Sequence, residues 1–161
     1  AKKHGCEYFA SAVGEVNVVE KMKSKDAVIG GEGNGGVILP DLHYGRDSLI
    51  GTALFLSHLV HSQKTCSQLR ADLPDYYMTK EKIQLTPDIN VDDLLEQMQK
   101  DYAQEEHSTI DGLKVDFADS WVHLRKSNTE PIIRVYTEAP SQEAADALAQ
   151  KIIKEIKAKV Q

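Results

Sequence analysis

The chain has 161 residues, of which 41% are hydrophobic and 27% are charged, a composition typical of a soluble protein of one or two domains. Its net charge of −6 arises in residues 67–161, because residues 1–66 hold seven basic and seven acidic side chains. This acidic balance excludes a general nucleic-acid surface, which needs a basic face. No apolar run approaches the roughly 20 residues that span a bilayer, so we expect no membrane insertion.

The first ten residues and the two cysteines bear on cellular location. Residues 1–10 lack the apolar core and small-residue cleavage site of a secretory signal, and they contain no initiator Met. Cys6 and Cys66 form no CxxC pair and have no His at metal-ligand spacing, so they do not make a disulfide framework. We therefore predict a cytoplasmic protein with reduced thiols, and the missing Met leads us to expect a piece of a longer polypeptide.

The first third of the chain alternates strand-like and helical patterns. Strands are predicted at 7–13, 26–32 and 36–40, and helices at 14–25 and 46–62. Asp47 or Ser48 can cap the start of the second helix, and apolar residues cover most of its circumference, which predicts that it is well buried. The alternation indicates an α/β fragment over residues 1–66, the end of a βαβ-type domain.

A polar segment at residues 62–74 separates this part from a second domain, predicted over residues 67–161. Strands are predicted at 75–85, 113–118, 120–125 and 131–139, and helices after Pro87 and from Ser141. The Asp111–Gly112 pair is a turn signal, and residues 104–107 are interpreted as a solvated helix end. The pattern predicts an α+β domain with an antiparallel sheet and two helices.

Anion-binding groups are concentrated in residues 125–134, which hold three basic side chains against one acidic one. Arg125 ends a predicted strand and can bind phosphate oxygens in pairs through its planar fork. Ser127 and Thr129 offer hydroxyl donors, Asn128 offers an amide, and Arg134 lies near the start of the following strand. These residues predict a nest for a phosphate monoester. The alternative is a plain hairpin turn, in which Ser, Asn, Thr and Pro are common.

A second loop, GGEGNGG at residues 30–36, has five glycines in seven positions but fits neither a dinucleotide-binding nor a P-loop fingerprint. It presents Glu32 and Asn34 on a bare backbone, and a carboxylate beside an amide suits the neighbouring hydroxyls of a sugar. The alternative is a tight connection with solvated polar residues. Glycine is entropically costly unless a positive φ or a close approach requires it, which weakens that alternative.

These loops, together with YGRDSLIG at residues 44–51, resemble the α-D-phosphohexomutase superfamily, which includes phosphoglucomutase, phosphomannomutase and phosphoglucosamine mutase. Residues 12–22, AVGEVNVVEKM, resemble the Val-Gly loop that precedes the family's sugar loop. The resemblance extends over almost the whole chain. It implies a third domain that carries a GExSG sugar loop, and a fourth, TBP-like domain that carries an RxSNTEP phosphate loop.

Carried over by position, the resemblance implies two sets of binding residues. The residues implied to contact the sugar are Glu32, Asn34, Val13 and Gly14, and those implied to bind phosphate are Arg125, Ser127, Asn128 and Thr129, with Arg134 beside them. Two positions depart from the family pattern. Asn34 stands where many members have Ser, which puts the sugar preference in doubt. Gly36 stands where several members have His, so any proton-transfer role of that His has no counterpart here.

The family's phosphoserine motif, of the Thr-Ala-Ser-His-Asn-Pro type, and its Asp-Gly-Asp-Gly-Asp-Arg magnesium motif do not occur in these residues. Phosphoryl transfer needs a phosphate carrier and stabilisation of charge by a metal. The resemblance therefore implies the C-terminal, substrate-binding part of a mutase. The catalytic serine and the Mg²⁺ ligands are then expected upstream of this chain, and the chain alone is expected to bind no cofactor and to be inactive.

The resulting hypothesis is an enzyme that interconverts hexose 1-phosphate and hexose 6-phosphate through an upstream phosphoserine and a hexose bisphosphate. Its expected partners are hexose phosphate, hexose bisphosphate and domains 1 and 2 of the same polypeptide. Arg46 and Asp47 are interpreted as surface and capping charges, and the pair His58 and His61 lacks a third metal ligand. The rival hypothesis is a stand-alone, noncatalytic phosphosugar-binding module.

Overall fold

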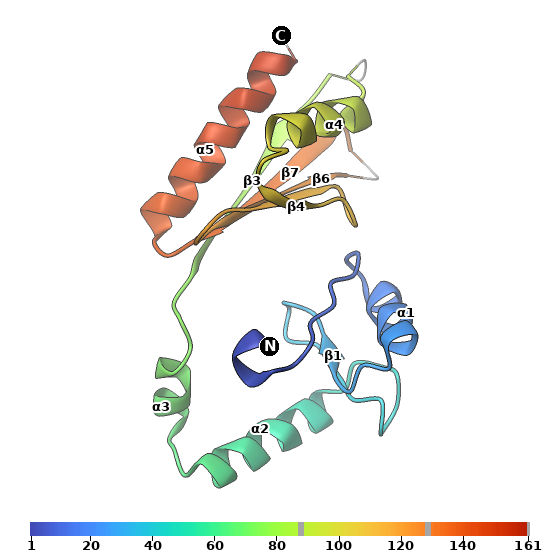
Figure 1. Ribbon diagram of the computed structural model, residues 1–161, viewed down its shortest axis with the longest axis vertical. Helices are drawn as coiled ribbons and strands as arrows, with labels where there is room; N and C mark the ends of the chain where they lie inside the picture. The colour runs from blue at the N-terminus through green and yellow to red at the C-terminus, as the bar shows by residue number, and fades with distance from the viewer. Residues whose placement is uncertain (87–88, 128–129, 161) are drawn as a thin grey trace. The chain divides into compact units, whose positions relative to one another are not determined.

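The computed structural model describes residues 1–86, 89–127 and 130–160, and the chain divides into two compact units, Ala1–Pro74 and Asp75–Gln161 (Figure 1). The division follows Pro74, whereas the sequence led us to divide the chain between residues 66 and 67. Within the polar segment of residues 62–74, Cys66–Ala71 form a short helix, α3. Thr65 and Gln68 form a capping box at its start, each side chain bonding the backbone N–H of the other.

The first unit holds a small hairpin with helices around it. Its elements are η1 (Lys2–His4), α1 (Glu15–Lys25), β1 (Gly30–Gly31), β2 (Val37–Ile38), α2 (Ser48–Ser62) and α3. The strands β1 and β2 pair antiparallel, with Gly30 opposite Ile38. Met22 of α1 lies against β1, where an added Cβ on Gly30 would come 2.1 Å from its sulfur. Met22 and Ile38 are the buried hydrophobic residues of this unit within the described ranges.

Two predictions for this unit are wrong. Residues 7–13 form no strand, because a strand needs a paired neighbour as well as an alternating pattern, and the described residues provide none for this segment. Helix α2 begins as predicted, with Asp47 accepting hydrogen bonds from the N–H groups of Leu49 and Ile50 at 2.8 and 3.0 Å. It is not well buried, however.

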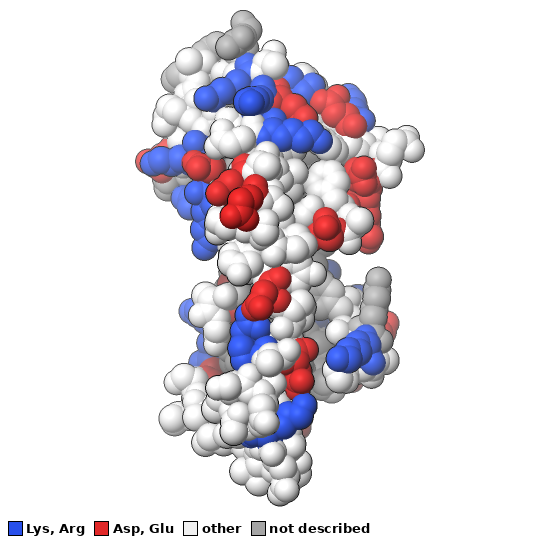
Figure 2. All heavy atoms as spheres, turned by 90° about the vertical axis from the view of Figure 1, so that its left-hand side faces the viewer, with Lys and Arg blue, Asp and Glu red and all other residues white. Residues whose placement is uncertain are grey.

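No residue of α2 is buried, and Leu49 and Val60 are 81% and 71% exposed. The helix contacts β2 where Gly51 meets Val37, and the described residues place no second layer over its remaining apolar surface. Figure 2 shows the result as an uncharged surface at the lower end of the first unit, where Figure 1 places α2. The apolar residues around α2 show that the helix is able to bury its surface. They do not show whether another segment of this chain covers it.

The second unit is an antiparallel sheet with two long helices on one face (Figure 1). Its elements are β3 (Tyr77–Gln84), α4 (Val91–Asp101), β4 (Glu106–Ser108), β5 (Leu113–Asp116), β6 (Trp121–Lys126), β7 (Ile132–Ala139) and α5 (Gln142–Lys159). The strand order is β3-β7-β6-β5-β4. Asn90 and Ser141 cap α4 and α5 by accepting hydrogen bonds from backbone N–H groups of the first turn.

One core lies between this sheet and its helices. It is formed by alternate residues of the strands and by apolar residues of α4 and α5: Ile83, Leu85, Leu94, Leu95, Met98, Leu113, Val115, Val122, Leu124, Ile133, Val135, Ile152, Ile153 and Ile156. Because side chains alternate along a strand, the residues between these point to the face opposite the helices. Polar and charged side chains of β5, β6 and β7 therefore share that outer face, next to the predicted phosphate loop.

The strands and helices predicted for this unit are confirmed, with one exception. Residues 104–107 were interpreted as a solvated helix end, but Glu106–Ser108 form β4, which pairs antiparallel with β5 at the edge of the sheet. Burial of the strand is partial, since Glu106 is exposed while His107 and Ser108 are half-buried. A three-residue edge strand with little apolar character leaves almost no periodic signal in the sequence.

Candidate functional site

The Val13–Gly14 segment lies directly before α1 in the first unit. Gly14 is the N-cap residue and has a φ of 119°, which L side chains rarely adopt. Its carbonyl accepts from the N–H of Val18 at 3.1 Å, and the amide of Asn17 donates to the carbonyl of Val13 at 2.9 Å. The glycine thus lets the chain enter α1 with the Val13–Gly14 backbone held against the first turn of the helix.

The glycine-rich loop connects β1 to β2 as a tight hairpin. The N–H of Glu32 donates to the carbonyl of Gly36 and the N–H of Gly35 to the carbonyl of Glu32, both at 3.0 Å. Gly35 has a φ of 94°, and an added Cβ on Gly31 would lie 2.4 Å from the carbonyl oxygen of Gly36. Asn34 accepts a hydrogen bond from the N–H of Gly36 through Oδ1 at 3.0 Å, which leaves its NH₂ group to donate elsewhere.

Arg46 joins this loop to the start of α1. Its Nε donates to Glu15 Oε2 at 2.8 Å, its backbone N–H donates to Glu15 Oε1 at 3.1 Å, and its Nη1 lies 3.6 Å from Glu32 Oε2. The hydrogen bond from the Arg46 backbone, with that from its side chain, lowers the pKa of Glu15. A side chain at position 36 would meet Arg46, since an added Cβ on Gly36 would lie 2.6 Å from its Cδ.

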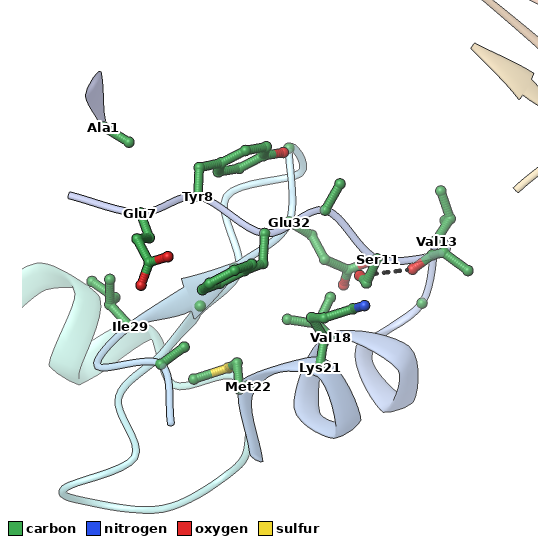
Figure 3. A pocket seen from close by; sticks show the side chains of 18 of the residues that line it. Ala1, Glu7, Tyr8, Ser11, Val13, Val18, Lys21, Met22, Ile29 and Glu32 are labelled. Atoms are coloured by element: carbon green, nitrogen blue, oxygen red, sulfur yellow. Dashed lines mark hydrogen bonds between the residues drawn. The ribbon is translucent and has the colours of Figure 1, made fainter. Parts of the chain in front are cut away.

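A hollow of about 820 Å³ brings the predicted sugar-binding residues together. Val13, Gly14, Glu32 and Asn34 all line it, and the side chain of Glu32 is only 16% exposed. Figure 3 shows Glu32 and Ser11 on one side and Lys21, which projects from α1, directed toward the same space. The volume suits a ligand of hexose phosphate size, since small-molecule pockets commonly measure about 300–1,000 Å³.

In the second unit, Arg125 lies at the end of β6 with its guanidinium fixed from one side. Its Nε is 3.1 Å from Asp111 Oδ2, and the two side chains are 28% and 27% exposed. Ser127 follows β6 and donates its backbone N–H to the carbonyl of Ile132 at 3.1 Å, which closes the hairpin. Arg134 lies on β7 directly opposite Arg125 in the antiparallel register. Asn128 and Thr129 lie outside the described residues.

The turn that carries Asp111 packs tightly on β6. Gly112 has a φ of 75°, and an added Cβ there would lie 2.1 Å from the carbonyl oxygen of Leu124. His123 donates a hydrogen bond through Nε2 to the carbonyl of Asp111 at 2.5 Å. Burial lowers the pKa of His123, while that carbonyl and the nearby Asp111 charge act in the opposite direction. The neutral ring thus connects β6 to the turn whose carboxylate holds Arg125.

The described ranges contain no group of three His, Cys, Asp or Glu side chains that could hold a metal ion. The Mg²⁺ that the resemblance implies therefore has no fitting ligand set in residues 1–86, 89–127 and 130–160. Within the same ranges, no helix combines the length and apolarity that crossing a membrane requires.

Two family models cover both units of the chain. The model described as phosphoglucomutase/phosphomannomutase, alpha/beta/alpha domain III, matches residues 1–77, and the model of the C-terminal domain of the same proteins matches residues 80–155. The chain belongs to the phosphoglucomutase/phosphomannomutase family. The superfamily and the fold class predicted from the sequence are therefore confirmed.

Members of this family from several organisms resemble the chain over nearly its full length. It is 39% identical over 150 residues to a phosphoglucomutase/phosphomannomutase of Thermococcus kodakarensis, covering 90% of this chain and 32% of that protein. It is 33% identical over 159 residues to a phosphoglucosamine/phosphogalactosamine mutase of Sulfurisphaera tokodaii, covering 98% and 35%. The crystal structure of a Burkholderia thailandensis family protein superposes with a TM-score of 0.74 at 29% identity, covering 96% of this chain and 33% of that one. The chain spans about a third of the length of these relatives.

The structure brings the predicted residues together in two groups and adds two that sequence reasoning missed. Val13, Gly14, Glu32 and Asn34 line one hollow, and Arg125 and Arg134 are cross-strand neighbours. Arg46 was interpreted as a surface charge, and Asp111 only as part of a turn. Their partners are 14 or more positions away, too distant for sequence spacing to reveal: Glu15 and Glu32 for Arg46, and Arg125 for Asp111.

Proposed function

We propose that this chain is the substrate-binding part of a phosphohexomutase that interconverts hexose 1-phosphate and hexose 6-phosphate. The observation that carries the proposal is the hollow of the first unit, where four residues implied by the family resemblance line one space. Family models match both units, and similar chains are named phosphoglucomutase/phosphomannomutase and phosphoglucosamine/phosphogalactosamine mutase.

In the first unit, Glu32 and Asn34 recognise sugar hydroxyls. A carboxylate accepts hydrogen bonds and the free NH₂ group of Asn34 donates them, so adjacent hydroxyls find both partners. Arg46, whose Nη1 lies 3.6 Å from Glu32 Oε2, holds the Glu32 carboxylate in place beside the hollow. Val13 and Gly14 supply backbone groups at its rim. We infer that glucose, mannose and glucosamine phosphates are the substrate class, with the choice among them set by Asn34 and by Gly36.

In the second unit, the loop after β6 binds the phosphate group. Asp111 occupies the Nε side of Arg125, which leaves the two terminal nitrogens for paired hydrogen bonds to phosphate oxygens. Ser127 adds a hydroxyl beside them, and Arg134 adds a second guanidinium in the neighbouring strand. Asn128 and Thr129 complete the proposed set on the strength of the sequence motif alone.

The chemical step is assigned to other parts of the polypeptide. We propose that domains 1 and 2 carry the phosphoserine and the Mg²⁺ ligands, and that a hexose bisphosphate is the intermediate. We also propose a cytoplasmic location, because Cys6 and Cys66 are free thiols, as a reducing compartment allows. The 161-residue chain should then bind hexose phosphate without converting it.

A binding experiment tests the proposal directly. Glucose 1-phosphate and inorganic phosphate are titrated separately into the isotopically labelled 161-residue chain and followed by NMR. Glu32→Gln should weaken glucose 1-phosphate binding and leave inorganic phosphate binding unchanged, because only the sugar contacts are altered. Glu20→Gln, on the exposed side of α1, is the matched control and should change neither.

Two outcomes contradict the proposal. Equal affinity of the parent chain and Glu32→Gln for glucose 1-phosphate would remove Glu32 from the sugar site. Failure of the parent chain to bind either ligand would remove the proposed function as a whole. In the full-length polypeptide that carries this chain, conversion of glucose 1-phosphate to glucose 6-phosphate distinguishes the mutase from the rival noncatalytic binding module.

A further inference from the structure

Three basic residues form one row across the second unit's sheet. Lys82 of β3 lies directly opposite Arg134 of β7, which lies directly opposite Arg125 of β6. Directly opposed residues in antiparallel strands project from the same face, with Cβ atoms about 4.5–5.5 Å apart. All three side chains therefore leave the sheet on the face opposite the core, at the end of β6 where the phosphate loop begins.

The positive charges of this row have fewer carboxylate or aromatic partners than those of the next row. One step along the sheet, Lys80 lies over the ring of Tyr136, at 5.7 Å from its centroid, and Lys114 is paired with Asp116. In the row of Arg125, the Asp111 carboxylate holds Arg125, while Lys82 and Arg134 have no carboxylate or ring partner among the described residues.

Like charges directly opposite each other on a sheet repel. Three aligned cations with one carboxylate leave a surplus of positive charge that an anion from outside can compensate. A phosphate monoester carries up to two negative charges near neutral pH and has three oxygens that accept hydrogen bonds. The row thus suits a phosphate group in two ways: its surplus charge is opposite in sign, and its side chains donate hydrogen bonds that the phosphate oxygens accept.

We propose that Lys82 is a third cationic ligand of the phosphate site, alongside Arg125 and Arg134. The inference rests on the proposed function of the loop after β6 and extends its site to a strand outside the RKSNTEP motif. Arg125, anchored by Asp111, fixes the orientation of the phosphate. Lys82 lies two strands away, on a flexible stem, and reaches the outer oxygens of the same group.

The test titrates inorganic phosphate into the labelled 161-residue chain and into variants of it, at constant ionic strength. Lys82→Gln should weaken phosphate binding about three- to tenfold, as expected for one partly exposed charged contact. Lys82→Arg keeps the charge and should restore most of the affinity. The matched control is Lys80→Gln, which removes the same charge from the same strand and face one row away. It should change the affinity by less than about twofold, because salt screens an exposed charge that does not contact the phosphate.

The outcomes separate this inference from the function on which it rests. Loss of binding in Arg125→Ala with an unchanged affinity in Lys82→Gln would overturn the role of Lys82 and leave the loop as the phosphate site. Equal losses in Lys82→Gln and Lys80→Gln would show a general charge effect and also overturn it. Absence of phosphate binding in the parent chain would overturn both. The amide spectrum of each variant verifies that the fold is intact.

Discussion

Replacing Gly112 with Ala tests whether the turn before β5 requires glycine to hold Arg125 in place. An Ala Cβ would lie 2.1 Å from the Leu124 carbonyl oxygen and 3.2 Å from the Cα of Arg125, and the φ of 75° is one that L side chains rarely adopt. Left-handed backbone costs an L residue roughly 1–2 kcal/mol. Weakened hydrogen bonding between the turn and β6 adds about 1 kcal/mol or more. We therefore expect a loss of about 2–4 kcal/mol in the free energy of unfolding.

Urea unfolding followed by tryptophan fluorescence measures this loss, because Trp121 is the chain's single tryptophan and lies on β6. Asp119→Ala, in the exposed turn between β5 and β6, is the control and should stay within about 0.5 kcal/mol of the parent. Gly112→Ala should also weaken phosphate binding, since the displaced turn carries Asp111 away from Arg125. An unfolding midpoint equal to that of the parent would refute the argument from close packing.

Three further predictions address other parts of the chain. Ser141→Ala removes the cap of α5 and should cost about 1 kcal/mol in the same unfolding assay. Because burial lowers the pKa of His123, the unfolded chain binds more protons, so stability should fall as pH drops below about 6.5. His123→Gln should flatten that dependence between pH 6.5 and 5.5, which unfolding at several pH values will show. Arg46→Ala should weaken glucose 1-phosphate binding while inorganic phosphate affinity, measured by titration, stays unchanged, because Arg46 acts through Glu32.

The second unit could be predicted well from the sequence because its elements carry strong local signals. Helix α4 keeps apolar residues on one face and begins at the capping residue Asn90, and β5, β6 and β7 alternate buried and outward residues. Each such pattern is complete within its own segment. Strand β4 has no comparable pattern, and its pairing with β5 depends on a partner that is found only after the turn at Asp111.

The first unit shows where this reasoning stops. Burial of α2 and strand formation by residues 7–13 depend on neighbours that a local pattern does not identify. The glycine-rich loop was singled out for its composition, and the structure explains Gly31 and Gly35 by the geometry of the hairpin itself. The roles of Arg46 and Asp111 likewise follow from contacts between segments that are distant in the sequence. The fold brings these segments together, and the spacing of residues in the sequence does not reveal the contacts.

The family resemblance supplied what local patterns did not. Residues 30–36 and 125–131 were each compatible with an ordinary turn. The N–H of Glu32 donates to the carbonyl of Gly36 in the first segment, and the N–H of Ser127 donates to the carbonyl of Ile132 at the end of β6. The surroundings of the two loops favour binding, since a hollow lies beside Glu32 and Arg134 lies directly opposite Arg125 on the sheet.

The central claim is that the loop beginning at Arg125 binds a phosphate group, and one titration tests it most directly. Inorganic phosphate is added to the parent chain, to Arg125→Ala and to Arg125→Lys, with binding followed through the amide signals of β6 and β7. Hydrogen bonds to charged groups contribute roughly 1.5–3 kcal/mol, so Arg125→Ala should weaken binding about tenfold or more. Arg125→Lys should fall in between, because an ammonium does not reproduce the planar fork. If Arg125→Ala binds phosphate as tightly as the parent, the loop is only a turn and the account is contradicted.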